Sequence, residues 1–229
     1  MPLSGLNSLK FKPKDLLIDA NSSINTVIMN FLSIDFSTDK GSLFLKVQNK
    51  TFSKLLQNDK LNNDLLMKQI LDFFAENNLE LDNISSIFVN QGPGNFSGLR
   101  GSLAIAKGIS LSKKISLFGY DTFIWSCAKF FNLKNSIVSI IKFRDKYFIK
   151  HFSKNLISTS KPEKIEENKL IEEYDSQLKV IPKNISINFS KKILALNNIK
   201  IIDLDHNELE FLQLKGLLNE DLIKPLYLS

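Results

Sequence analysis

The sequence has one cysteine, Cys127, and two histidines, His151 and His206. A single cysteine excludes an internal disulfide. So few imidazole and thiolate groups also argue against a zinc or iron centre and against a Ser–His–Asp or Cys–His catalytic arrangement. No apolar run reaches the roughly 18 residues that a membrane-spanning helix needs. The first residues lack a basic region followed by an apolar core, so we expect no signal peptide, no membrane contact and a cytoplasmic location.

Arginine is also scarce, since Arg100 and Arg144 are the only two and the remaining cations are lysines. The formal net charge is +6 and the pI is about 9.2, a balance that favours an anionic partner such as nucleic acid. The lysines are scattered, however, and no aromatic residues are interleaved with them. The charge therefore gives only weak support for direct nucleic-acid binding.

The chain is rich enough in apolar residues to form a globular fold, with 43% hydrophobic and 24% charged residues over a length of 229. Apolar periodicity divides the part after Met29 into strands and helices. The predicted strands are 31–35, 42–47, 50–56, 84–90, 115–118, 136–141, 146–152, 178–181 and 200–204. The first predicted helix starts at Asn62 or Asn63. The other predicted helices span 96–113, 123–131 (capped by Thr122), a part of 161–176, and 207–218 (capped by Asn207). Turns are predicted at Gly119 and at Arg144-Asp145.

This order predicts an α/β fold with two lobes and a mixed sheet in each. We expect residues 29–120 to form the first lobe and residues 121–229 the second, with the C-terminal segment packing back on the first. Residues 1–28 show little periodicity, so we expect a dispensable extension, which translation from an upstream start codon would explain.

Glycine is concentrated in one place, because five of the nine glycines lie between Gly92 and Gly108. The run from Gln91 to Arg100 leaves a buried-looking strand and opens a helix, where free backbone N–H groups could bind an anion. The spacing matches neither G-x-G-x-x-G nor the P-loop pattern. A phosphate-binding loop and a tight structural turn therefore both remain open. The candidate loop residues are Gly92, Gly94, Asn95, Ser97, Gly98 and Arg100.

Small residues form one stripe along the helix that follows this loop, since Ser97, Gly101, Ala104 and Gly108 recur at helical spacing. Glycine inside a helix costs about 1 kcal/mol relative to alanine, so a close neighbour is expected, either within the lobe or from another chain. The preceding helix carries a wide apolar stripe. We predict that both helices pair with equivalent helices of a partner in a four-helix contact. The remaining predicted interface residues are Leu66, Ile70, Phe73 and Phe74.

Arg100 lies in the first turn of its helix, where a cation is mildly unfavourable against the helix dipole. Arginine in a chain dominated by lysine indicates a bidentate or stacked contact. We therefore expect Arg100 to bind a carboxylate or a terminal carbonyl, in this chain or across an interface. Arg144 lies on a predicted hairpin turn and should tolerate lysine.

At this point a family resemblance is visible. Gly92-Pro93-Gly94-Asn95-Phe96-Ser97-Gly98-Leu99-Arg100 resembles the G-P-G-S-F-T-G-L-R signature of the TsaB (YeaZ) family. Ile34-Asp35-Phe36-Ser37-Thr38 is similar to its opening I-D-T-S-T, and Pro225-Leu226-Tyr227-Leu228 to its closing P-x-Y-L-R. The resemblance covers about residues 29–229 and is weakest between Lys154 and Asn219. In the second lobe, Lys142-Phe143-Arg144 stands where the family commonly has D-A-R.

The resemblance implies two ribonuclease-H-like lobes of the actin, Hsp70 and sugar-kinase superfamily, with mixed β-sheets flanked by helices. It implies a role in making threonylcarbamoyladenosine beside the anticodon of tRNA. The implied partners are a TsaD-like paralogue, which carries the metal and the transfer chemistry, and a TsaE-like ATPase, with tRNA bound indirectly through the complex. This chain would be a scaffold with no catalytic residue, no metal and no cofactor of its own, and a homodimer is an open alternative.

Asp35 stands where kinases of that superfamily hold a magnesium–phosphate group. A nucleotide-binding phosphotransferase or ATPase is therefore the alternative function, and ATP in the complex is left open. A lone carboxylate after a strand is more often a turn residue. The H-x-x-x-H pair of the catalytic paralogue is absent, because His151 and His206 are far apart in the sequence.

Overall fold

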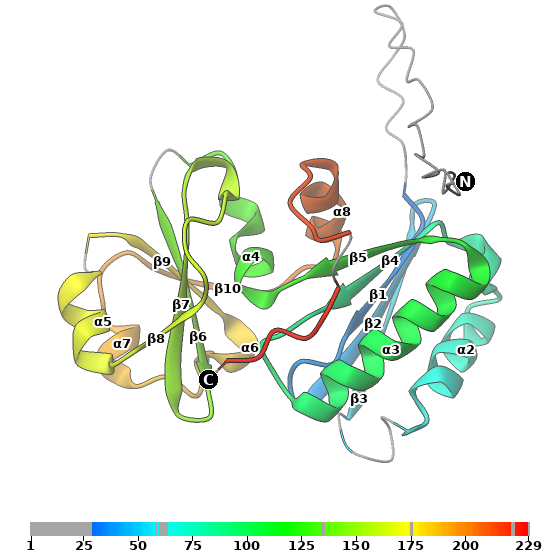
Figure 1. Ribbon diagram of the computed structural model, residues 1–229, viewed down its shortest axis with the longest axis horizontal. Helices are drawn as coiled ribbons and strands as arrows, with labels where there is room; N and C mark the ends of the chain where they lie inside the picture. The colour runs from blue at the N-terminus through cyan, green and yellow to red at the C-terminus, as the bar shows by residue number, and fades with distance from the viewer. Residues whose placement is uncertain are drawn as a thin grey trace, which may run out of the picture.

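The computed structural model describes residues 29–57, 59, 64–133, 136–174, 176–220 and 223–228. These residues form two lobes, each built on a five-stranded β-sheet (Figure 1). The predicted two-lobed α/β architecture is thus confirmed. The extension 1–28 and the predicted helix caps Asn62 and Asn63 lie outside the described residues.

The order of the elements follows the sequence prediction closely. The first sheet and its helices comprise β1 (Phe31–Asp35), β2 (Lys40–Val47), β3 (Lys50–Gln57), α2 (Leu66–Glu76), η1 (Leu81–Asn83), β4 (Ser86–Asn90), α3 (Phe96–Lys113) and β5 (Ser116–Tyr120). The remaining elements are α4 (Thr122–Cys127), η2 (Ala128–Phe130), β6 (Ile137–Phe143), β7 (Lys146–Phe152), η3 (Lys154–Leu156), β8 (Glu163–Ile165), α5 (Glu167–Glu173), β9 (Leu178–Pro182), α6 (Lys183–Ser186), α7 (Lys191–Leu194), β10 (Ile199–Ile202) and α8 (Asn207–Leu214).

The two sheets repeat one topology. The strand orders are β3-β2-β1-β4-β5 and β8-β7-β6-β9-β10. In the first sheet β1 pairs antiparallel with β2 and parallel with β4, and in the second sheet β6 pairs antiparallel with β7 and parallel with β9. The antiparallel strands follow one another along the chain, whereas the parallel strands are joined by crossover connections. This is the ribonuclease-H-like arrangement that the sequence predicts for both lobes.

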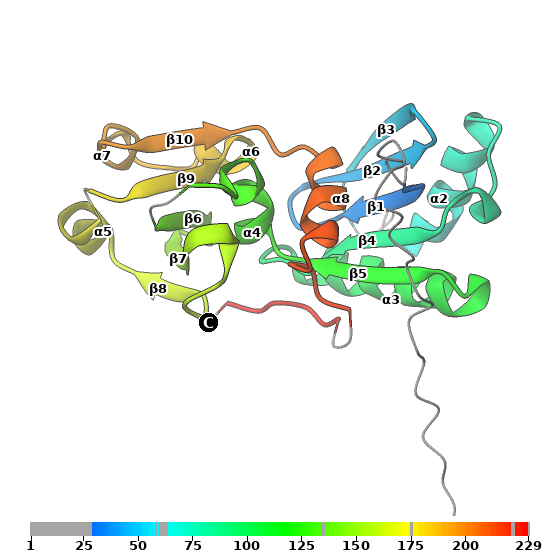
Figure 2. The same ribbon diagram turned by 90° about the horizontal axis from the view of Figure 1, so that it is seen from above.

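The period of the strands decides what each sheet face packs against. Along β1, Leu32 and Ile34 point into a core with α2 and α3, whereas Phe31 points to the opposite face. That opposite face meets α4 and α8, and α4 also packs on β6 and β9 of the second sheet. The result is a layered molecule, with α2 and α3 outside one sheet, α5 and α7 outside the other, and α4 and α8 between them (Figure 2).

The inner helices make one continuous core out of both lobes. Trp125 of α4 and Leu212 of α8 belong to the same buried cluster as Phe88 of the first sheet and Phe148 of the second. Burying a side chain of this size contributes about 1.5–3 kcal/mol. The lobes are therefore packed together along their inner faces.

Several local predictions are wrong in detail. Gly119 lies inside β5, not in a turn, and the side chain that caps α4 belongs to Asp121, not to Thr122. The N-cap position of α8 is His206, and that helix ends at Leu214, not at residue 218. A short strand, β8, occupies part of the segment in which only a helix was expected.

Candidate functional site

The glycine-rich loop between β4 and α3 is held closed by the chain's own backbone. A Cβ atom on Gly94 would lie 2.0 Å from the carbonyl oxygen of Ser37, and the backbone N–H of Asn95 donates to the same oxygen at 2.7 Å. Gly92 has a φ of +110°, a conformation that favours glycine. These glycines are explained by close backbone approach within the lobe.

The first N–H groups of α3 already have an acceptor inside the chain. Asn95 is the N-cap residue, and its Oδ1 accepts from the backbone N–H groups of Ser97 at 3.1 Å and Gly98 at 3.4 Å. Donors that a phosphate would use are thus occupied. This geometry favours the structural turn over the phosphate-binding loop.

Below the loop, buried polar side chains meet at the carboxyl ends of β1 and β4. The Nδ2 group of Asn90 lies 3.0 Å from Asp35 Oδ1, 3.3 Å from Ser37 Oγ and 3.1 Å from Thr122 Oγ1. The Ser37 N–H also donates to Asp35 Oδ1 at 2.9 Å. Asn90 therefore ties together the ends of two strands and the start of α4.

Asp35 is a buried carboxyl group in this cluster. Burial raises its pKa above the usual value, and the hydrogen bonds from Ser37 and Asn90 oppose that rise only in part. A raised pKa means that keeping Asp35 ionised costs folding free energy. Carboxyl groups with such a pKa also occur at functional sites. Here the described hydrogen bonds to Asp35 come from Ser37 and Asn90 of the same lobe, so Asp35 fixes the loop.

The second lobe supplies no matching carboxylate. The strand that corresponds to β1 is β6, and it ends at Phe143, where β1 ends at Asp35. Among the described residues, no group of three or more His, Cys, Asp and Glu side chains is arranged to hold a metal ion. The polar cluster is therefore one-sided, with groups from the first lobe and the start of α4.

The C-terminal segment is fastened to the same loop through Gln91. Its backbone oxygen accepts from the Leu226 N–H at 2.6 Å, its Nε2 donates to the Lys224 oxygen at 2.8 Å, and its Oε1 accepts from Asn219 Nδ2 at 2.6 Å. The segment (red in Figure 1) runs across the junction between the lobes. The segment thus closes over the loop and ends at the second lobe.

A cleft of about 700 Å³ lies beside this segment and is lined by residues that include Gln91, Asp121, Asn219, Glu220 and Lys224. None of the polar cluster residues Asp35, Ser37, Asn90 and Thr122 lines it. This cleft and the buried polar cluster are therefore separate. In the part of the chain that the structure describes, no helix is both long and apolar enough to cross a membrane.

The predicted interface residues of α2 have a different role from the one expected. Their side chains form the core of the first lobe, because α2 turns its apolar stripe toward the sheet; they are Leu66, Ile70, Phe73 and Phe74. A partner cannot contact these side chains without unfolding the lobe. The apolar side chains that α2 leaves exposed are Met67 and Leu71.

The predicted stripe on α3 does face outward. Ser97, Ala104 and Gly108 are exposed and Gly101 is half-buried. A Cβ atom on Gly101 or Gly108 would meet nothing within 4 Å, so these glycines are not needed for packing inside this chain. Figure 1 shows α3 beside α2 on the outer side of the first sheet.

Arg100 makes a stacked contact, without the expected ion pair inside the chain. Its guanidinium carbon lies 4.9 Å from the centre of the Phe96 ring, and Phe96 stacks on Tyr227 with ring centres 5.3 Å apart. Among the described residues, no carboxylate forms an ion pair with Arg100. Asn90, Gln91 and Tyr227 were not among the predicted site residues, although Asn90 ends the predicted strand, Gln91 opens the glycine run and Tyr227 belongs to the closing motif.

Part of the sequence is similar to known proteins. The family model for TsaD, tRNA N6-adenosine threonylcarbamoyltransferase, matches residues 59–138. The chain is 33% identical over 87 residues to the tRNA threonylcarbamoyladenosine biosynthesis protein TsaB of Buchnera aphidicola subsp. Baizongia pistaciae, covering 37% of this chain and 38% of the relative. It is 32% identical over 92 residues to the TsaB of Buchnera aphidicola subsp. Schizaphis graminum, covering 40% and 43%. The chain thus matches about two fifths of the length of these relatives.

Solved structures are similar over much more of the chain. YeaZ from Pseudomonas aeruginosa superimposes with a TM-score of 0.64 at 14% identity, covering 87% of this chain and 100% of that one. An uncharacterized protein with similarity to peptidase YeaZ from the same organism gives a TM-score of 0.66 at 15% identity, covering 88% and 100%.

The repeated sheet topology and these structural matches define a two-lobed fold like that of the YeaZ structures. The glycine-loop motif, the sequence matches and the family model narrow the class further. By these criteria the chain is similar to TsaB (YeaZ) proteins and, over residues 59–138, to TsaD.

Proposed function

We propose that this chain acts in the biosynthesis of threonylcarbamoyladenosine on tRNA, as a non-catalytic subunit that binds and supports a TsaD-like catalytic paralogue. A TsaE-like ATPase would complete the complex, and tRNA would be bound through the complex in the cytoplasm. The names of the matched relatives carry the biosynthetic role, and the subunit role and the partners are what the family resemblance implies.

The observation that carries the proposal is the outer face of α3. Two glycines in the middle of an 18-residue helix, Gly101 and Gly108, have open space where a side chain would lie. Each weakens the helix by about 1 kcal/mol relative to alanine, and no described residue packs within 4 Å of the place where its Cβ would lie. A second helix packed closely on this face would account for them.

The polar cluster supports a scaffold role over the nucleotide-binding alternative. Asp35 is buried, its acceptor atom is used by Ser37 and Asn90, and the backbone of Ser37 fills the space above Gly94. A loop that binds a nucleotide phosphate would need backbone N–H donors that are free to contact it. The second lobe contributes Phe143 at the corresponding strand end.

Reconstitution of the modification with purified components tests the proposal. Threonylcarbamoyladenosine formation on tRNA would be measured with the TsaD-like and TsaE-like proteins of the same organism, with and without this chain. We expect product only when this chain is present. This chain alone should not turn over ATP.

Two results would contradict the proposal. Full product formation without this chain would remove its supporting role. Steady ATP hydrolysis by this chain alone, abolished by Asp35→Ala, would favour the ATPase alternative. Asp145→Asn, on the exposed hairpin turn of the second lobe, is the matched control.

A further inference from the structure

We infer that the α3 face of this chain is built to receive an acidic surface of its partner, and that Arg100, stacked with Phe96 and Tyr227, binds one of the partner's carboxylates. The inference rests on the proposed function, because it describes the chemistry of the same interface. It goes beyond that function by committing to the charge of the partner surface and by including the C-terminal segment.

The charge of α3 is of one sign. The helix runs from Phe96 to Lys113 and carries Arg100, Lys107 and Lys113 with no acidic residue. Lys113 pairs with Asp82 of the same chain at 2.8 Å. Among the described residues, Arg100 and Lys107 have no ion-pair partner. The exposed small-residue stripe is therefore bordered by two unpaired cations.

Arg100 is part of a platform made from two distant segments. Phe96, at the start of α3, contacts both the guanidinium group of Arg100 and the ring of Tyr227. Phe96 and Tyr227 remain 49% and 54% exposed. Among the described residues, no group accepts a hydrogen bond from the Arg100 guanidinium, so its N–H donors are available to a carboxylate, which arginine can bind through two parallel hydrogen bonds.

The C-terminal segment fixes one side of this platform. Leu226, the residue before Tyr227, donates its backbone N–H to the Gln91 oxygen at 2.6 Å. Tyr227 is thus held next to the glycine loop and not left as a free end. The docking surface therefore extends from the α3 stripe to the end of the described chain.

A second copy of this chain fits the surface poorly. The carboxylates of α2 are already paired within the lobe, Asp72 with Lys68 at 2.6 Å and Glu76 with Lys54 at 2.6 Å. Two copies meeting through α3 would bring together basic helices with no acidic residue of their own. Like charges at an interface are unfavourable, so the charge pattern favours a different, acidic partner.

Calorimetric titration of the purified TsaD-like paralogue into this chain, at low and at high salt, tests the inference. Arg100→Gln should weaken binding about tenfold at low salt and reduce the salt dependence, because a charge-assisted contact is lost. Lys107→Gln should weaken binding by a smaller factor. Tyr227→Ala should weaken it through loss of the stacked ring.

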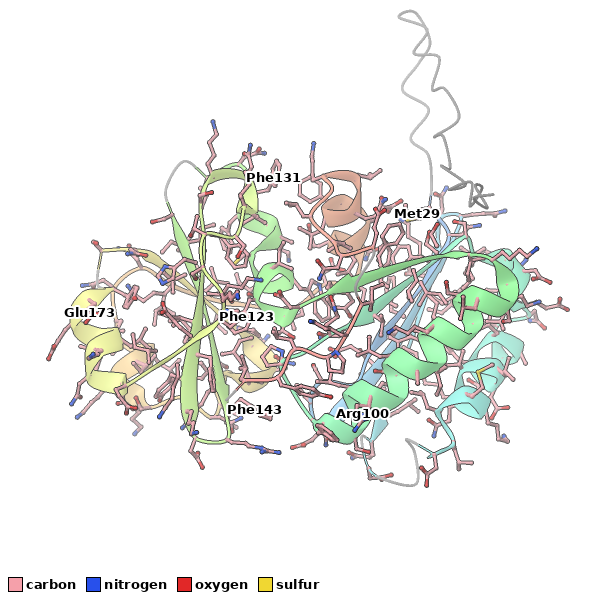
Figure 3. All side chains as sticks on the ribbon, viewed as in Figure 1. Met29, Arg100, Phe123, Phe131, Phe143 and Glu173 are labelled. Atoms are coloured by element: carbon pink, nitrogen blue, oxygen red, sulfur yellow. The ribbon has the colours of Figure 1, made fainter. Side chains whose placement is uncertain are left out.

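Arg144→Gln is the matched control. Arg144 is also exposed and also lies over an aromatic ring, with its guanidinium carbon 5.2 Å from the centre of Phe143, but it belongs to the second lobe. Figure 3 shows Arg100 and Phe143 on separate lobes. The control should bind the paralogue with unchanged affinity.

The outcomes separate the inference from the proposed function. If the paralogue binds and Arg100→Gln behaves like Arg144→Gln, the acidic-partner inference is overturned and the proposed function stands. If the wild-type chain does not bind the paralogue, both are overturned. A tight homodimer of this chain that Arg100→Gln dissociates would also overturn the inference. Because Arg100 is exposed, its variants should keep the wild-type melting temperature.

Discussion

The two lobes share one sheet topology but differ in the helices that cover their outer faces. In the first lobe the connection between β4 and β5 is α3, a continuous helix of 18 residues, and α2 has 11 residues. In the second lobe the corresponding connection holds α6 and α7, with 4 residues each, and α5 has 7 residues. Only the first lobe has a long helical surface.

The ends of the equivalent strands β1 and β6 also differ between the lobes. β1 ends in a buried carboxyl group tied to Asn90, whereas the equivalent β6 ends in Phe143 beside the hairpin turn of Arg144 and Asp145. The first lobe thus has both the fixed loop and the open helix face. The second lobe contributes its inner face to the shared core. The repeated fold explains the shape of the molecule, and the helices of one lobe explain its proposed role.

The inner and outer glycines of the first lobe should respond in opposite ways to alanine. Gly94→Ala should destabilise the chain by about 3 kcal/mol, at the upper end for overpacking, because the new Cβ would meet the backbone of Ser37. Gly101→Ala should instead raise stability by up to about 1 kcal/mol, because its Cβ enters open space in a helix. Urea unfolding of both variants measures these effects, and equal destabilisation would contradict the structure.

We expect the stability of the packing between the lobes to fall in acid because of His206. Its ring stacks on Phe44 with centres 5.0 Å apart, and Nδ1 and Nε2 lie 2.9 Å from Ser33 Oγ and 3.2 Å from Ser42 Oγ. Burial lowers its pKa to about 4, and neighbouring Asp205 opposes this only in part. The folded chain therefore holds His206 neutral, while the unfolded chain protonates near pH 6.5.

The sign of the pH effect follows from this difference. Stability should be independent of His206 above about pH 6.5 and should fall as the pH drops toward 4, by about 3 kcal/mol at most. His206→Gln retains hydrogen-bonding groups but cannot be protonated. Thermal unfolding between pH 4 and pH 7 should show a weaker pH dependence for this variant than for the wild type. Parallel curves would show that His206 does not set the acid sensitivity.

The polar cluster of the first lobe should be stabilised by removing its charge. Because the pKa of Asp35 is raised, ionised Asp35 lowers stability at neutral pH, and this cost disappears as the pH falls through its folded-state pKa. Asp35→Asn keeps an acceptor for Ser37 and Asn90 and should raise stability at pH 7 by about 1 kcal/mol. Denaturant unfolding measures the change, with Asp145→Asn on the exposed second-lobe hairpin as control. A loss of stability would mean that the charge itself holds the loop.

Local sequence signals predicted most of the fold. The bounds of α3 follow from the glycine run and from Asn95, a good N-cap, and the structure places that helix at the predicted residues. The strand pattern and the family motif likewise gave two mixed sheets. The short strand β8 was missed because three residues with two charges carry no alternating pattern.

Features that depend on tertiary contacts could not be read from the sequence. The stripe Leu66, Ile70, Phe73 and Phe74 is equally consistent with a core face and an interface, and only the position of the sheet shows that it is core. Gly119 was taken for a turn because nothing in the sequence shows that the Gln91 side chain packs on it. The stacking of Arg100 on Phe96, next to Tyr227, joins residues from both ends of the chain.

The most direct measurement compares one helix-face variant from the first lobe with one surface variant from the second. Gly101→Leu places a large side chain on the open face of α3, and Ile187→Ser removes the most exposed apolar side chain of the second lobe, which is 88% exposed. Both variants should fold with near wild-type melting temperatures. In calorimetric titrations with the TsaD-like paralogue, we predict at least about tenfold weaker binding for Gly101→Leu, because bulk separates closely packed helices, and unchanged binding for Ile187→Ser. Full binding by Gly101→Leu together with loss of binding by Ile187→Ser would contradict the claim that the first lobe carries the interface.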